Sequence, residues 1–186
     1  MVLSAIVTEL KNTIVASIQG AGDVLTALRE TVKNQVVGSL QNVGEVATAT
    51  LDNVSDIVEA GILSAKDSGT TLVGAAKETV SAAVMGVSEV GGDVVTASAK
   101  AVSGAVKGAG EVGEDVGAVA VSAVEGVIDT TGKLGKSTSE ATREAVVSAI
   151  RTADSIGSEA GGSVRSALLS ASSLPKDIVE AATKGS

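Results

Sequence analysis

The 186-residue chain contains no Phe, Trp, Tyr, His or Cys and only one Pro. Without cysteine there is no disulfide and no thiolate chemistry. Without histidine the chain lacks the commonest general base and metal ligand. Missing aromatic residues remove base-stacking platforms, and a formal net charge of −8 disfavours a nucleic-acid partner. We therefore expect neither an enzyme nor a protein that carries a cofactor or metal.

What the sequence does contain is 44% hydrophobic residues, almost all of them Ala, Val, Ile and Leu, together with 22 Gly. That content is too high for a charged, disordered segment. No hydrophobic run reaches the roughly 18 residues that a membrane span needs, and the start lacks the basic stretch of a secretory signal. We therefore expect a cytoplasmic protein.

A repeat of 22 residues, made of two units of 11, runs through the sequence. Residues 80–101, 102–123, 124–145 and 146–167 align without insertion or deletion. With Leu3 as position a of an eleven-residue frame lettered a to k, every a residue is hydrophobic or Gly. Positions a, d, h and k carry none of the 36 charged residues, 14 basic plus 22 acidic. The frame therefore separates an uncharged stripe from a charged one.

Eleven residues correspond to three helical turns of 3.67 residues, which predicts an α-helix with a right-handed supercoil. The uncharged positions and position e then form one continuous stripe. We predict an all-α protein of one or a few very long amphipathic helices, in a right-handed coiled coil, bundle or filament. The continuous repeat region covers 1–172. A break at Ser-Ser-Leu-Pro then sets off a short helical segment, 173–186.

The glycines allow two interpretations. Pairs such as Gly91-Gly92 resemble turn signals. However, the frame continues across them without a shift, which favours glycines that let helices pack closely. The predicted helix-packing residues are the alternating Val and Gly of position a: Val58, Gly69, Val80, Gly91, Val102, Gly113, Val124, Gly135, Val146 and Gly157. Small residues also dominate positions c and g, which predicts helix contacts on two sides.

The segment AAKETVSAAVMGVSEVGG (75–92) resembles the eleven-residue amphipathic repeats of synucleins, perilipins and exchangeable apolipoproteins. That resemblance implies a helix that coats membranes or lipid droplets, or one that protects under stress. The chain also resembles hendecad coiled-coil proteins, which implies a structural role. Because the net charge is negative and no bulky side chain is available to enter lipid, we favour a structural protein that assembles with itself. Lipid coating is the alternative.

Two motifs resemble catalytic or cofactor sites. Glu111, Glu114 and Asp115 are spaced as an oxygen-ligand metal site would be, but they fall on the charged stripe, as a solvated acidic face does. Residues 108–113 spell GxGxxG without a preceding strand, which does not indicate a dinucleotide site. We therefore place the function in the repeated surface.

Overall fold

The computed structural model describes residues 4–41 and 51–185. Within these ranges the chain forms nine helices and no strand: α1 (Ala5–Ile18), α2 (Val24–Gln41), α3 (Asp52–Asp67), α4 (Leu72–Glu89), α5 (Val94–Glu111), α6 (Val116–Leu134), α7 (Thr138–Ile156), α8 (Ser158–Ser170) and α9 (Lys176–Lys184). The all-α prediction is confirmed. The prediction of one or a few very long helices is wrong, because the longest described helix has 19 residues. Leu3 and Ala47, two a positions, lie outside the described residues.

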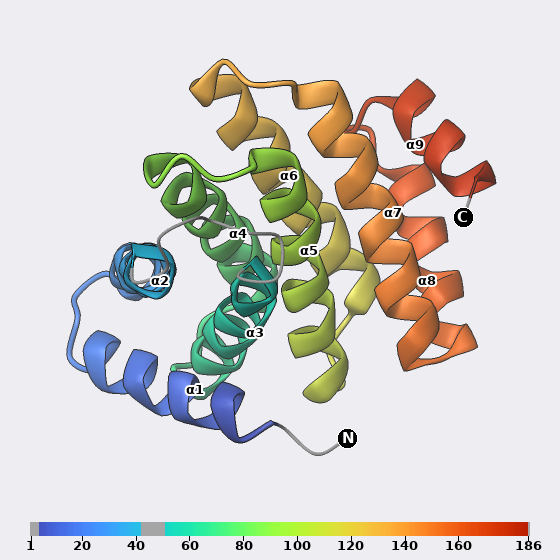
Figure 1. The fold of residues 1–186 in the computed structure, drawn as a ribbon. Helices are drawn as coiled ribbons and strands as arrows, with labels where there is room; N and C mark the ends of the chain where they lie inside the picture. The colour runs from blue at the N-terminus through green and yellow to red at the C-terminus, as the bar shows by residue number, and fades with distance from the viewer. Residues whose placement is uncertain (1–3, 42–50, 186) are drawn as a thin grey trace.

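The helices form two layers (Figure 1). α1, α3, α5, α7 and α9 follow one another in one layer, and α2, α4, α6 and α8 form the other. Consecutive helices form hairpins across the layers. Each helix also packs beside the helix two places along the chain, and from α1 to α8 these same-layer neighbours run in parallel. The architecture is that of an α-solenoid, in which each unit contacts only its neighbours.

The helices end at regular intervals because one turn recurs with the repeat. Gly69, Gly91, Gly113 and Gly135 all adopt a positive φ, between 64° and 72° for three of them and 77° for Gly91. This left-handed conformation after the last helical residue suits glycine because it has no Cβ. The next N–H then bonds back into the helix, as Gly92 N–H does to the Val87 carbonyl at 2.9 Å. Each such turn ends one helix and reverses the chain.

The prediction that these four glycines let helices pack closely is wrong. A methyl group added at any of them would meet nothing within 4 Å. The frame passes through the turns unshifted because an 18-residue helix such as α4 plus the four-residue turn 90–93 makes 22 residues, two full frame units. An unbroken register is therefore compatible with a turn whenever the turn recurs at the same spacing.

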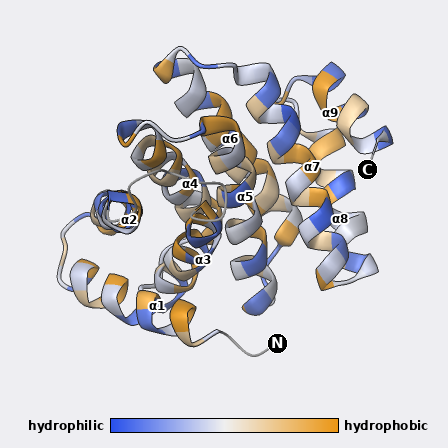
Figure 2. Cartoon of the chain, viewed as in Figure 1, coloured by the Kyte–Doolittle hydropathy of each residue, from blue (hydrophilic) through white to orange (hydrophobic). Residues whose placement is uncertain are grey.

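The hydrophobic core lies between the layers and uses one a residue from each of the first eight helices. These residues are at most 1% exposed: Ile14, Val36, Val58, Val80, Val102, Val124, Val146 and Leu168. Figure 2 shows hydrophobic residues concentrated in the central helices. The uncharged stripe is thus covered by other helices of the same chain. No helix in the described ranges is long and apolar enough to cross a membrane.

The C-terminal helices depart from the regular spacing. Gly157 alone separates α7 from α8, in an extended conformation. After α8, the chain turns through 171–174, and Pro175 precedes the first residue of α9. Proline suits this position because its missing N–H is not needed before the first helical turn. α9 packs mainly against α7, with Val179 and Ala182 buried.

Candidate functional site

The predicted helix-packing residues divide into two groups. The five valines, Val58, Val80, Val102, Val124 and Val146, are each 0% exposed and lie in the core. Four of the glycines, Gly69, Gly91, Gly113 and Gly135, lie in turns, and Gly157 joins α7 to α8. The valines and the glycines therefore do different things: the valines pack, and the glycines change the chain direction.

Residues that do permit close helix packing include glycines at position c of the frame, in α5 and α6. Every helix from α1 to α8 carries a small residue there: Ala16, Gly38, Ala60, Ala82, Gly104, Gly126, Ser148 and Ser170. A methyl group at Gly104 would overlap the Ser55 carbonyl oxygen of α3. One at Gly126 would lie 2.8 Å from the Lys77 carbonyl oxygen of α4. Parallel neighbours therefore touch backbone to backbone, and the predicted contacts at small c and g residues are present.

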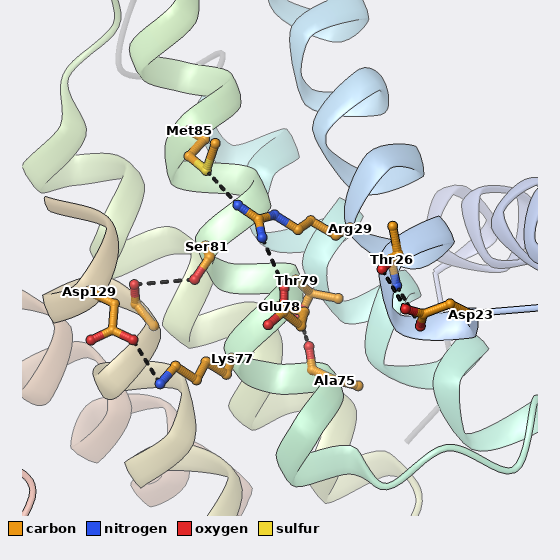
Figure 3. Close-up of polar contacts among 11 residues, drawn as sticks. Asp23, Thr26, Arg29, Ala75, Lys77, Glu78, Thr79, Ser81, Met85 and Asp129 are labelled. Atoms are coloured by element: carbon orange, nitrogen blue, oxygen red, sulfur yellow. Dashed lines mark hydrogen bonds and ion pairs between the residues drawn. The ribbon is translucent and has the colours of Figure 1, made fainter. Parts of the chain in front are cut away.

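Polar side chains connect the same parallel neighbours. Lys77 of α4 pairs with Asp129 of α6 at 2.7 Å (Figure 3). Ser81 of α4 donates to the Gly126 carbonyl of α6 at 3.3 Å. The hydrogen bond to Asp129 raises the pKa of Lys77. Further same-layer ion pairs join Lys11 to Asp67, Lys33 to Glu89, Lys66 to Glu114 and Lys100 to Asp52. Because these pairs are partly exposed, each contributes at most about 1 kcal/mol.

The two ends of the described array present different surfaces. The outer face of α1 is a shallow groove of exposed residues, with one charge among them: Ala5, Thr8, Glu9, Asn12, Thr13, Ala16 and Ser17. Ala16 corresponds to Ala60 in α3 and Gly104 in α5, both of which are buried by the preceding helix of the layer. At the other end, the exposed residues of α9 include Lys176, Asp177, Glu180 and Lys184.

The acidic triplet and the GxGxxG spelling serve structural roles. Asp115 caps α6 by accepting from the Ala118 N–H at 3.0 Å, and Glu114 pairs with Lys66. Residues 108–113 cover the end of α5 and its turn. In the described ranges, no three carboxylates gather as a metal site. Clefts of 490 and 660 Å³ flank Glu114 and Asp115, between neighbouring turns.

Among the described residues, Glu59 of α3 is the acid whose pKa is raised most, and it is not among the site residues predicted from the sequence. It is 8% exposed, and burial raises the pKa of its carboxyl to about 7. The equivalent residues at intervals of 22 are Val15, Val37, Ser81, Ser103, Glu125, Val147 and Leu169. A carboxyl where most helices carry Val or Ser was the available signal.

Ser55 lies one turn before Glu59 on the same face of α3. Its hydroxyl is buried and has no hydrogen-bond partner in the described parts of the chain. The interface between α3 and α5 therefore contains a buried hydroxyl without a partner among the described residues, next to the buried side chain of Glu59.

Comparison of the sequence with models of protein families and with curated proteins gives no match.

Proposed function

We propose that the protein is a structural helical protein that assembles with itself and has no catalytic activity. The observation that carries this proposal is a difference in burial at position c of the repeat. A neighbouring helix covers the c residue in α3 (Ala60) and in α5 (Gly104), whereas the c residue of α1, Ala16, lies exposed on the outer face of that helix. A helix face that is covered elsewhere in the same array fits a further helix of the same kind.

The composition of that face supports the proposal. Ala16 and its exposed neighbours on α1 are small, so another backbone can approach closely, and Glu9 is the one charge among the residues of the groove. Ile6, at the same end, is 59% exposed. A helix face that contacts only solvent usually carries more charged residues than the outer face of α1 does.

The alternative function, a coat on membranes or lipid droplets, would use the uncharged stripe to contact lipid. In the folded chain this stripe is buried: Val58, Val102 and Val146, for example, are 0% exposed. Lipid coating would therefore require the layers to separate, and each exposed valine would cost about 1.5–3 kcal/mol until lipid covered it. Self-assembly of the folded chain requires no such opening.

Circular dichroism and sedimentation with and without lipid distinguish the two functions. We expect a helical protein in lipid-free buffer with a mass above the 18.0 kDa of one chain. Liposomes or an oil emulsion should not change its helix content. A disordered monomer that becomes helical only on lipid would contradict the proposal in favour of the coat. Detection at 280 nm is impossible because the chain has no Trp or Tyr.

The outer face of α1 is tested by Ala16→Arg, which places a long charged side chain where a close neighbour is proposed. We expect the variant to lose the assembled species and keep its helix content. Ser170→Arg is the matched control, because Ser170 is the exposed c residue of α8 at the other end of the repeat. Assembly that survives Ala16→Arg would show that another surface is used.

A further inference from the structure

The two layers end differently on the C-terminal side of the stack. In one layer α7 is followed by α9, whereas in the other layer α8 is the last described helix (Figure 1). Leu169 of α8 is 44% exposed. Its counterpart in α4, Ser81, is 8% exposed because α6 covers it and accepts its hydrogen bond. The outer face of α8 is therefore open at the place where a further helix would pack.

α9 does not pack on α7 as the regular helices pack on their neighbours. Residues 56–60 and 177–181 have the same sequence, DIVEA, at the same positions of the frame. In α3 the alanine of this sequence, Ala60, is 0% exposed, whereas in α9 the same alanine, Ala181, is exposed. Of the nine residues of α9, Val179 and Ala182 are buried. α9 is therefore a short cover on α7 rather than a further repeat.

Beneath α9, the outer face of α7 resembles the surfaces that receive a small c residue elsewhere in the stack. Gly126 of α6 lies against the backbone of Lys77 in α4, and Arg143 of α7 holds the same frame position as Lys77. Ala16 of a second copy, placed as Gly126 is, would therefore lie against the backbone of Arg143.

The charges match in the same register. Glu9, the one charge of the α1 groove, lies seven residues before Ala16, and Lys136 lies seven residues before Arg143. Because same-layer neighbours run in parallel, the shift that places Ala16 on Arg143 also places Glu9 beside Lys136. Lys136 is exposed. The outer face of α1 thus fits α7 in both size and charge.

The number of helices distinguishes α7 from α9 as the site for α1. The described helices α1 to α8 place four in each layer. If α1 of a second copy followed α7, its α2 would follow α8, and both layers would continue. If α1 followed α9, its α2 would lie about 10 Å too far from α8, and Leu169 would stay exposed. The exposed charges of α9, such as Lys176 and Glu180, also fit the small residues of α1 poorly.

We propose that the outer faces of α7 and α8 accept α1 and α2 of a second copy, and that α9 covers the α7 part of this acceptor surface in the single chain. α9 then has to leave α7 before a second copy docks, so α9 limits assembly. This inference rests on the proposed self-assembly, for which it names the surface that receives the outer face of α1.

Variants of the full chain test the role of α9 by sedimentation over a dilution series. Val179→Asp places a charge on the buried side of α9 and should release it, and Ala181→Asp, on the exposed side, is the matched control. A docking site that is covered part of the time weakens the apparent affinity in proportion. Because burial of one valine corresponds to about 10- to 100-fold in an equilibrium constant, Val179→Asp should assemble at about 10- to 100-fold lower concentration. Ala181→Asp should not differ from the unmodified chain, and adding Ala16→Arg to Val179→Asp should abolish assembly.

Leu169→Arg tests the acceptor surface without changing α9. It should weaken assembly, whereas Ser170→Arg, at position c of the same helix, should not. Assembly that Val179→Asp does not strengthen, or that Leu169→Arg does not weaken, would overturn this inference and leave the proposed function standing. Monomers at every concentration, in the unmodified chain and in Val179→Asp alike, would contradict the proposed function itself.

Discussion

Two glycines of α6 provide a matched test of the close contact between parallel helices. A methyl group at Gly126 would lie 2.8 Å from the Lys77 carbonyl oxygen and 3.2 Å from the Ser81 hydroxyl. A methyl group at Gly132, in the same helix, would meet nothing within 4 Å. Both replacements by Ala remove the same glycine entropy, about 1 kcal/mol, in favour of the helix. The difference between the two variants therefore isolates the cost of contact.

The size of that cost follows from the overlap. Ordinary contacts begin at 3.4 Å, so α4 and α6 must separate by about half an ångström to accept the new methyl at Gly126. The Ser81 hydrogen bond to the Gly126 carbonyl, already 3.3 Å long, would lengthen with them. Overpacking of this kind costs about 1–3 kcal/mol. We expect Gly126→Ala to be less stable than Gly132→Ala by that amount.

Thermal and urea unfolding followed by far-ultraviolet circular dichroism measures the difference. For a chain of this length, the expected gap in Tm is about 3–10 °C. Gly104→Ala, where the overlap with the Ser55 carbonyl oxygen is greater, should be less stable again. If Gly126→Ala gained as much stability as Gly132→Ala, the parallel helices would not be in backbone contact and the packing argument would fail.

The remaining predictions use the same unfolding measurements. Asp115→Ala removes the cap on the Ala118 N–H and should cost about 1 kcal/mol, and no loss would mean that the cap does not form in solution. Val102→Ala leaves a cavity in a fully buried site and should cost about 1–3 kcal/mol, more than any exposed ion pair. Because the folded chain holds the Glu59 proton up to about pH 7 and the unfolded chain releases it near 4.5, stability should fall by up to about 3 kcal/mol as pH rises through this window. Glu59→Gln should remove that fall, and an unchanged pH profile would contradict the burial of the charge.

Much of the fold follows from the sequence by periodicity. The charge-free stripe predicts helices, and its a residues at intervals of 22, such as Val58 and Val102, are the buried core. The small c residues predict contacts on two sides, which Gly104 and Gly126 make. These features depend only on helix geometry, which the sequence pattern encodes directly.

The path of the chain does not follow from the periodicity. A four-residue turn completes an 18-residue helix to 22 residues, so the eleven-residue frame is the same for a straight helix and for a folded stack. The distinguishing signal is local: Gly91 or Gly113 is followed two residues later by Asp93 or Asp115, a helix N-cap. Reading glycine and cap together would have identified the turns.

Glu59 was missed because burial depends on which helices become neighbours. A charge at position b is solvated on a single helix, but α5 covers the same position in a layer. Residues of this kind become visible only after the repeat has been assigned to individual helices.

Small-angle X-ray scattering on a dilution series tests the central claim, that the repeat folds back into a two-layer stack. A compact chain of 186 residues has a radius of gyration of about 16 Å. An unbroken helix through the repeat would extend for about 250 Å, which corresponds to a radius of gyration on the order of 70 Å. We predict a value below about 20 Å at the lowest concentration. A rod-like profile with a radius several times larger would contradict the account.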